Sequence, residues 1–549
     1  MQRQTQMKWS LILVLTVLGA ALLWTNSARS TDTYASIQNS LVPLVNVYKE
    51  VSRRYVDPVD SQKFLRAGID GMLGTLDPYT NYIDREDKDQ LEILTEGKYE
   101  GVGLVLNYRN NVVTVAEPPF QGTPAARAGL REGDRILKVG GLLTKDLGFE
   151  KTVGQIRGPA GTEVTLTIER DGEPKPLEFT LVRKSITVED VQYAGFLENG
   201  VGYILLTRFS KNAGPEVDRA IQQLKTRGEL NALVLDLRSN PGGMLEAAVE
   251  VSELFLPRNT PIVSTRGRTP DAEQQHRSRR DPVFGQGRLV VLVNAFSASA
   301  SEIVAGAVQD HDRGIIVGDT TFGKGLVQTV VPLSPDAALK ITTAKYYTPS
   351  GRCIQRKHYS DWEDSTDLDP AAEFRTVSGR PVSGGGGIIP DLVVPLPEAS
   401  DYYWDLRRKS LFFNFAVTYA NTHPVKDSTV AVTSDILEAF RGYLNEKKYE
   451  YRHPIEKELT ALKNESIRKG YGNEILKNID VLEKSLNRAE EDMFANSLGD
   501  IRKTLRSELV SKYFSVRRQV AAGIQEDAVV QKALSLLTDP GSYDSLLKK

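Results

Sequence analysis

Three serines stand at alternating positions in the stretch 297-SASASE-302, which ends on a glutamate. The apolar run 289-LVVLVN-294 before it predicts a strand, and a helix is expected to begin near Ser299. Ser299 and Glu302 have the spacing of a capping box, which is a structural role. The N–H groups at a helix N-terminus can also stabilise an oxyanion, so Ser299 is at the same time a candidate nucleophile for acyl transfer.

A serine nucleophile needs a base, and no histidine lies near this stretch in the sequence. If residues 299–310 are helical, His311 lies roughly 16–18 Å from Ser299, at the far end of the helix. The strand predicted at 314-GIIVGD-319 returns about as far at ~3.3 Å per residue, which brings Lys324 back beside the serine. The pattern therefore favours Lys324 as the base and leaves His311 as a polar loop residue.

A lysine acts as a base only when it is neutral, so its usual pKa of about 10.4 has to fall through desolvation or a nearby positive charge. The neighbours Phe322, Leu326 and Val327 would supply an apolar setting. Gln328 would orient the Lys324 amine through its amide oxygen without adding a countercharge. A carboxylate in the place of Gln328 would raise the pKa of the lysine and weaken the base.

A tetrahedral intermediate also needs hydrogen-bond donors for its oxyanion. The predicted strand 231-NALVLDLR-238 ends in 239-SNPGG-243, and glycines at a strand end let backbone N–H groups approach a ligand closely. Gly242 or Gly243, together with the N–H of Ala300, would form a two-donor oxyanion hole. Taken alone, the same residues are an ordinary turn.

The stretch 318-GDTTFGKG-325 nearly matches a phosphate-binding loop, since Gly318, Gly323 and Lys324 have the required spacing. Gly325 stands where such a loop needs a Ser or Thr hydroxyl for Mg²⁺. The candidate metal-binding acid, Asp236, also precedes this segment instead of following it. The mismatch argues against a nucleotide triphosphatase and leaves Lys324 available for another role.

The composition of the 549 residues, 40% hydrophobic and 26% charged, is that of an ordinary globular protein with room for three or four domains. Lys and Arg total 69 against 71 acidic residues, a balance that offers no basic excess for nucleic acid. Cys353 is the single cysteine, and the five histidines are not paired at ligand spacing. We therefore expect no metal site and no cofactor.

The N-terminus has the pattern of an export signal. Arg3 and Lys8 precede the apolar run 11-LILVLTVLGAALLW-24, and the small residues Ser27 and Ala28 follow it. Residues 1–30 are therefore predicted to be a cleaved signal peptide or, as the alternative, a retained membrane anchor. The run is short for a full span, which favours cleavage. In both cases we expect the protein to work in the periplasm or cell envelope.

Four regions with different sequence patterns follow. Residues 31–94 carry apolar residues at helical spacing, whereas residues 95–185 alternate short β-type runs with glycine turns. Residues 186–400 alternate apolar strands with helices, which predicts an α/β layer fold with a largely buried sheet. Residues 401–549 are charged and helical and are interpreted as a solvated scaffold or a dimerisation appendage. Within 186–400 we expect strands at 201–209, 231–238, 289–294 and 314–319, and helices near 214–227, from Met244 and at 299–309.

Six motifs in order resemble the carboxyl-terminal processing (tail-specific) serine proteases over roughly residues 40–396. They are 76-LDPYTNYID-84, 236-DLRSNPGG-243, 297-SASASE-302, 323-GKGLVQ-328, 345-KYYTPSGR-352 and 384-GGGGIIPDLVV-394. The resemblance implies a crotonase-like α/β core with an inserted PDZ domain, a β-rich and partly open barrel. It also implies a Ser–Lys dyad in which Ser299 is the nucleophile, Lys324 the base, Gln328 the residue that positions the lysine, and Glu302 a supporting acid. The oxyanion donors would be Ala300 and a glycine of the NPGG turn, with Gly243 favoured over Gly242.

Residues 95–185 fit the PDZ domain that the resemblance implies. The loop formed by Gly101, Val102, Gly103 and Leu104 would hold a peptide's terminal carboxylate on its backbone N–H groups, with the peptide added as a strand. Arg157, in 156-IRGPAGT-162, is expected to couple the PDZ domain to the core. Two features stand outside the match: the helical region 401–549, and Cys353, which we expect to be a small buried residue.

The sequence thus predicts an exported serine endopeptidase that binds protein C-termini through its PDZ domain and cleaves near them through an acyl-enzyme. Its partners would be peptide substrates with accessible C-termini, with an N-terminal membrane tether, a homodimer and an activating adaptor left open. One alternative is a non-catalytic PDZ scaffold on a protease fold, which the intact set of Ser299, Lys324 and Gln328 disfavours. Another is a crotonase-like enzyme acting on coenzyme A thioesters, which the export signal disfavours.

Overall fold

The computed structural model describes residues 39–109, 111–335, 337–356, 373–395, 399–423, 430–451, 454–491, 493–514 and 516–548. The predicted signal segment, residues 1–30, lies outside these ranges. The chain divides into two units, Met1–Tyr82 and Ile83–Lys549. Within the described ranges, no helix combines the length and the apolar character needed to cross a membrane.

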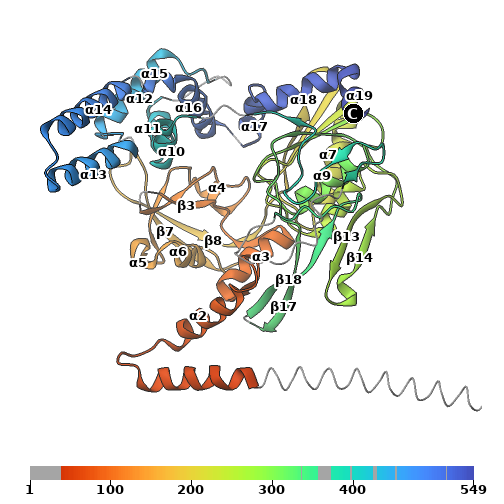
Figure 1. Cartoon of the computed structure of the whole chain (residues 1–549), viewed down its shortest axis with the longest axis horizontal. Helices are drawn as coiled ribbons and strands as arrows, with labels where there is room; N and C mark the ends of the chain where they lie inside the picture. Colours follow the sequence, from red (N-terminus) through yellow and green to blue (C-terminus); the bar gives the residue numbers. More distant parts are fainter. Residues whose placement is uncertain are drawn as a thin grey trace, which may run out of the picture. The chain divides into compact units, whose positions relative to one another are not determined.

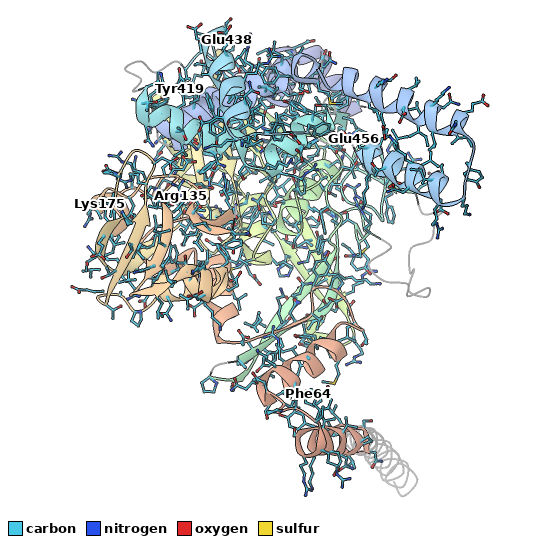
Figure 2. The ribbon with its side chains drawn as sticks, turned by 90° about the vertical axis from the view of Figure 1, so that its left-hand side faces the viewer. Phe64, Arg135, Lys175, Tyr419, Glu438 and Glu456 are labelled. Atoms are coloured by element: carbon cyan, nitrogen blue, oxygen red, sulfur yellow. The ribbon has the colours of Figure 1, made fainter. Side chains whose placement is uncertain are left out.

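The first unit is helical where it is described. A helix over residues 39–54 is followed by α2 (Ser61–Leu73). Asp60 caps α2, because its carboxylate accepts the first-turn N–H groups of Gln62 and Lys63 at 3.1 and 3.2 Å. The rings of Tyr48 and Phe64 pack 5.4 Å apart between the two helices, and Figure 2 labels Phe64 on α2. The strand β1 (Asn81–Ile83) follows at the boundary of the two units.

The first part of the second unit is a small β-domain with its own apolar core, in the region where the sequence predicts short β-type runs. Val113, Ile136, Leu166 and Ile168 lie at its centre with at most 1% of each residue exposed. Lys175, in the turn between its last two long strands, is exposed and points away from the sheet (Figure 2). Its elements are α3 (Arg85–Glu96), a β2–β9 ladder (Lys98–Gly101, Lys184–Thr187), the sheet β3-β4-β5-β7-β8 (Leu106–Arg109, Val112–Val115, Arg135–Val139, Glu163–Glu169, Leu177–Val182) with β6 (Leu142–Leu143) on β5, and α4 (Pro124–Ala128), α5 (Thr144–Leu147) and α6 (Phe149–Ile156).

The second part is the α/β core. Its sheet has the order β10-β11-β12-β15-β16-β21, with β10 antiparallel and the other strands parallel. The predicted strands and helices of this region are confirmed with small shifts of their ends. The elements are β10 (Val191–Phe196), η1 (Glu198–Gly200), β11 (Val201–Leu206), α7 (Ala213–Arg227), β12 (Ala232–Asp236), α8 (Leu245–Ser252), β15 (Arg288–Val293), α9 (Ala300–Asp310), β16 (Ile315–Gly318) and β21 (Leu392–Val393).

Both faces of this sheet are buried, which explains why its strands are apolar at almost every position. Leu233 and Val291 pack into the cluster that α7, α8 and α9 cover, whereas their neighbours Val234 and Val290 face the opposite way. The opposite face is covered by side chains of the C-terminal helices, including Val530, Ala533 and Tyr543. The end of the chain is therefore a layer of the α/β core, a role that the sequence did not indicate.

A second sheet, which the sequence did not predict, borders the core. Its strand β18 (Ala337–Tyr347) pairs antiparallel with β17 (Leu326–Ser334) and with β13 (Pro261–Gly267), and β13 pairs with β14 (Gln274–Arg277). Figure 1 shows β17 and β18 as the two arms of one hairpin. Because β17 begins two residues after Lys324, the hairpin fixes the position of the candidate base. The remaining short elements are η2 (Pro270–Ala272), β19 (Phe374–Arg375) and β20 (Pro381–Val382).

The C-terminal region is helical, as predicted. Leu406, Phe412, Phe440 and Leu505 are each at most 2% exposed and belong to an apolar cluster of its own. Figure 2 labels Tyr419 on α11 and Glu438 on α12, within this cluster's helices. The helices are α10 (Asp401–Arg408), α11 (Leu411–Thr422), α12 (Ser434–Glu446), α13 (Pro454–Arg468), α14 (Asn473–Glu491), α15 (Met493–Asn496), α16 (Leu498–Tyr513), α17 (Val516–Ile524), α18 (Ala528–Thr538) and α19 (Pro540–Lys548).

Candidate active site

Ser299 lies at a sharp turn between β15 and α9. It is the N-cap of α9 with φ 55° and ψ −113°, a backbone conformation that is uncommon for a residue with a side chain. Ser299 and Glu302 form the predicted capping box, in which the Ser299 N–H donates to the Glu302 carboxylate at 2.7 Å. A strained residue on a strand-to-helix turn is the usual setting of a serine nucleophile in α/β hydrolases, because the turn presents the hydroxyl.

The other two serines of the stretch are structural. Ser297 is fully buried, donates to the carbonyl oxygen of Leu237 at 2.8 Å and accepts the N–H of Asn294 at 2.9 Å. Ser301 is also fully buried and donates to the carbonyl oxygen of Asn240 at 2.9 Å. Ser299 is only half-buried, so it is the one serine of the three that a substrate can reach.

Glu302 connects the candidate nucleophile to the candidate base. Its Oε2 accepts the N–H groups of Ser299 at 2.7 Å and Lys324 at 2.9 Å, and its Oε1 accepts the Gly323 N–H at 2.7 Å and the Thr321 hydroxyl at 2.6 Å. The hydroxyl of Thr321 itself accepts the N–H of Ile388, so its hydrogen is free to point at Glu302. Every one of these contacts treats Glu302 as an acceptor, which is the pattern of an ionised carboxylate.

Burial raises the pKa of Glu302 above its ordinary value, and hydrogen bonds from Thr321, Lys324, Gly323 and Ser299 oppose that rise. Because one oxygen atom receives the N–H groups of both Ser299 and Lys324, the two residues are held side by side. This juxtaposition agrees with the predicted path out along the helix and back along the strand.

Gln328 lies on β17, four residues after Lys324. Its Nε2 donates to the hydroxyl of Thr342 on β18 at 3.4 Å. The β17–β18 register shifts between Val327 and Gln328, and such a bulge changes the direction of a side chain locally. The contact of the Gln328 amide oxygen with the Lys324 amine stays a prediction.

The NPGG turn packs directly on the candidate nucleophile, Ser299. A Cβ at Gly242 would lie 2.9 Å from the Ala300 nitrogen and from the Ser299 Cβ, so only glycine allows this approach. The Gly242 N–H donates to Asn240 Oδ1 at 2.9 Å and is therefore used within the turn, which corrects its inclusion among the oxyanion donors. Within the described residues, the N–H groups of Gly243 and Ala300 donate to no other group, so these two stay available to a ligand.

The small β-domain contains a cavity of about 330 Å³ beside the predicted peptide-binding loop. Val102, Gly103 and Leu104 line it, whereas Gly101 ends β2 and lies outside the lining. Gly103 has φ 89°, and a Cβ there would lie 2.4 Å from Thr123, so a larger residue would displace the loop. Apolar side chains from β3 and α6 complete the lining, among them Leu106, Phe149, Val153 and Ile156.

Arg157 also lines this cavity, with its guanidinium 5.5 Å from the centre of the Tyr99 ring. Burial raises the pKa of Tyr99 to about 12, while the charge of Arg157 and the N–H groups of Gly103 and Leu104 oppose the rise. Arg208, from the segment after β11, lines the same cavity and pairs with Asp190 at 2.6 Å. The cavity is thus bordered by two arginines, one from each domain.

Comparisons with known proteins relate four parts of the chain to known families. The family model described as peptidase family S41 matches residues 200–361, and a PDZ domain model matches residues 120–170. A model of the C-terminal helical domain of a probable PDZ-protease matches 404–537, and one of the N-terminal domain of the activating protease CtpB matches 21–87. A carboxy-terminal-processing protease of Bartonella bacilliformis is 38% identical over 386 residues, which are 69% of this chain and 81% of that protein.

The chain belongs to the carboxy-terminal-processing protease family. A carboxyl-terminal-processing protease of a Synechocystis strain is 35% identical over 383 residues, covering 65% of this chain and 87% of the relative. A solved structure described as a photosystem II D1 C-terminal processing protease is 29% identical and covers 57% of this chain and 89% of its own, with a TM-score of 0.33.

Several residues that hold the site of this carboxy-terminal-processing protease were missed by sequence reasoning. Tyr346 is 1% exposed and donates from its hydroxyl to the Ser299 carbonyl oxygen at 3.1 Å. Asn240 donates to the Leu206 carbonyl oxygen at 2.8 Å, and its own carbonyl oxygen accepts the Ala298 N–H at 3.0 Å. Asn240 and Tyr346 lie inside quoted motifs, but nothing in their spacing indicates these partners.

The sequence assigns no catalytic role to His311 or Cys353. His311 is the C-cap of α9, and its Nε2 lies 2.7 Å from the Pro261 carbonyl oxygen, so it stands at the far end of the helix as expected. Cys353 is 3% exposed, and burial raises the pKa of its thiol, which disfavours the reactive thiolate. The described residues contain no cluster of three metal-ligating side chains.

Proposed function

We propose that the chain is an exported serine endopeptidase that cleaves protein substrates near their C-termini with a Ser299–Lys324 dyad. The observation that carries the proposal is the shared Glu302 oxygen, which holds the half-buried Ser299 next to Lys324. Within the described residues the N–H groups of Ala300 and Gly243 donate to no other group, and the turn that contains Gly243 packs on Ser299. The crotonase-like class of the core and the partly open barrel of the PDZ domain belong to this proposal too.

In the proposed reaction, Ser299 Oγ attacks the carbonyl carbon of the scissile peptide while its proton passes to the neutral Lys324 amine. The carbonyl oxygen becomes an oxyanion that accepts hydrogen bonds from the Ala300 and Gly243 N–H groups. The intermediate collapses to an acyl-enzyme, and the leaving amine takes the proton from Lys324. Water then attacks the ester and gives its proton to Lys324, which returns it to the serine.

The PDZ cavity would capture the C-terminus of the substrate. Backbone N–H groups of Val102, Gly103 and Leu104 offer donors to a terminal carboxylate, and the apolar lining suits an apolar last residue. Arg157 places a positive charge at the border of the cavity, which favours a terminal carboxylate. Arg208, which is paired with Asp190, brings a residue of the α/β core to the same border, which favours coupling between the domains. It stays a prediction that the segment 1–30, cleaved or retained, directs export. A homodimer and an activating adaptor also stay open predictions.

A cleavage assay tests the dyad. Ser299→Ala and Lys324→Ala are each incubated with an unfolded protein that ends in apolar residues, beside the unaltered chain. The proposal expects cleavage by the unaltered chain only, because the nucleophile and the base act as one unit. Undiminished cleavage by either variant would reject the dyad, and cleavage by neither the variants nor the unaltered chain would favour the non-catalytic alternative.

A further inference from the structure

The strand that leads into the oxyanion turn ends on a buried charge cluster. Asp236, the last residue of β12, is 1% exposed and accepts the Tyr203 hydroxyl at 2.7 Å. It also accepts three donors of Arg238: the backbone N–H at 2.9 Å, Nε at 3.0 Å and Nη2 at 2.6 Å. The Arg238 side chain is therefore folded back on its own strand, immediately before the turn 239–243.

The second edge of the Arg238 guanidinium is bound by a residue of the C-terminal helical region. Arg238 Nη1 lies 2.8 and 3.1 Å from the two carboxylate oxygens of Asp527. Burial acts to lower the pKa of Arg238, but the negative charges of Asp236 and Asp527 outweigh it and raise the pKa above its ordinary value. Arg238 thus stays a cation between two carboxylates, with 20% of its side chain exposed.

Asp527 is held firmly in place. It is the N-cap of α18, where its Oδ1 accepts the N–H groups of Val529 and Val530 at 2.9 and 3.1 Å. The helix behind it packs on the sheet, and the Arg288 side chain donates to the Leu537 carbonyl oxygen at 2.9 Å. Loss of the Asp527 carboxylate would therefore leave α18 docked on the core.

The turn that follows Arg238 is tied to the nucleophile segment. Ser239 has φ 57°, and its N–H donates to Asn294 Oδ1 at 2.9 Å, while Asn294 Nδ2 returns a bond to Ser239 Oγ at 3.1 Å. The Ala298 N–H donates to the Asn240 carbonyl oxygen at 3.0 Å. A displacement of Arg238 would therefore reach the turn that presents the Gly243 N–H.

Space for such a displacement exists beside the cluster. A cavity of about 300 Å³ is lined by Tyr203, Asp236, Arg238, Ser239, Asn294 and Asp527, together with apolar residues of α17. While Asp527 is present, the guanidinium is fixed on both edges and does not turn into this cavity. Without it, one edge of a buried cation loses its partner and gains an open volume to enter.

We propose that Asp527 is a positioning residue for the oxyanion turn: through Arg238, the C-terminal helical region holds the Gly243 N–H in the geometry that the transition state needs. The inference rests on the proposed function, since it concerns the same acyl transfer. It assigns α17 and α18 a role in the reaction that a peripheral appendage would not have. Asp527 touches no reacting atom and acts only through Arg238.

The test uses the full chain with Asp527→Ser, because serine keeps the N-cap of α18 but is too short to reach Arg238. We expect kcat to fall roughly threefold to thirtyfold with KM within about twofold, since the turn matters in the transition state and not in binding. The rate of labelling of Ser299 by a fluorophosphonate should fall by the same factor. Asp527→Asn, which keeps one acceptor for Arg238, should recover part of the loss.

The matched control is Glu526→Gln, which changes the neighbouring acid that pairs with Arg506 and leaves Arg238 untouched. Its kcat should equal that of the unaltered chain.

The inference is overturned if Asp527→Ser keeps its kcat and labelling rate, or if KM rises while kcat is unchanged. If Asp527→Ser fails to fold, Asp527→Asn decides by the same criteria, and an unchanged kcat overturns the inference. An unaltered chain that neither cleaves nor reacts with the probe refutes the proposed function instead, and the inference falls with it.

Discussion

Two buried carboxylates flank the reaction centre and are held in different ways. Glu302 is held by three backbone N–H groups and one hydroxyl, all within 2.9 Å. Asp236, at the end of the strand that leads into the NPGG turn, is held by the Tyr203 hydroxyl and by a cation, Arg238, that also binds Asp527. Glu302 is satisfied mainly by backbone N–H groups, whereas Asp236 is satisfied mainly by the neighbouring Arg238, whose other edge binds the distant Asp527.

The difference indicates two kinds of support. Glu302 sets the mutual position of the proposed nucleophile and base directly, because its partners include Ser299, Gly323 and Lys324 themselves. In the proposed account, Asp236 acts through Arg238 on the turn that would carry the oxyanion donor, so its influence is indirect. We therefore expect a change at Glu302 to affect the reaction more strongly than a change at Asp236.

The largest effect is expected for Glu302→Gln. The amide keeps one acceptor oxygen but turns an NH₂ group toward N–H groups that need an acceptor, which costs about 2–4 kcal/mol of folding stability. The displacement of Ser299 and Lys324 should lower kcat by about 100-fold or more. Thermal unfolding and peptide cleavage measure the two effects, and a variant with wild-type kcat would show that Glu302 positions neither residue.

Asp236→Asn should have the next largest effect. The amide still accepts from Tyr203 or Arg238, but the buried arginine loses half of its countercharge, so kcat is expected to fall about tenfold. The double variant Asp236→Asn/Asp527→Ser tests whether the two acids act through the same side chain. If both act through Arg238, the losses in kcat should be non-additive. Fully additive losses in kcat would mean that Asp236 and Asp527 act independently.

Ser297→Ala and Ser301→Ala form a matched pair within the nucleophile segment. Ser297→Ala removes a donor and an acceptor and should lower the free energy of unfolding by about 1–3 kcal/mol. Ser301→Ala removes one donor and should lower it by about 0.5–1.5 kcal/mol. Both should keep kcat within about threefold, since neither hydroxyl takes part in the proposed reaction. A loss of activity comparable to that of Ser299→Ala in either variant would contradict the choice of Ser299.

The smallest effect is expected for Tyr203→Phe. It removes only the hydroxyl that Asp236 accepts and leaves Arg238 paired on both edges, so stability should fall by about 0.5–1.5 kcal/mol and kcat by less than about twofold. Denaturant unfolding and the cleavage assay provide the measurements. A fall in kcat as large as that of Asp236→Asn would show that the tyrosine, and not the arginine, holds the turn.

Local patterns in the sequence predict much of this site. The alternation of apolar strands and helices from β11 to β16 is a local signal, and it places Ser299 at a helix start with Lys324 on the returning chain. The capping box of Ser299 and Glu302 is likewise visible as a three-residue spacing. These features could be predicted because each depends on residues close to one another in the sequence.

The rest depends on contacts between distant residues. The pair of Arg238 and Asp527 spans 289 positions, and no periodicity connects them. The choice between Gly242 and Gly243 depends on which N–H the Asn240 side chain accepts, which spacing does not determine. The packing of α18 on the sheet was missed because the sequence of an amphipathic helix shows that it has an apolar face but not which part of the protein that face packs against.

The most direct test of the account is the position of a covalent adduct. The full chain is treated with a fluorophosphonate, digested and mapped by mass spectrometry, beside Ser299→Ala and Lys324→Ala. We predict a single adduct on Ser299 in the unaltered chain, none on Ser299→Ala, and a labelling rate reduced by about 100-fold or more in Lys324→Ala because the serine lacks its base. An adduct on another residue, or equal labelling of the Lys324→Ala variant, would contradict the Ser299–Lys324 dyad.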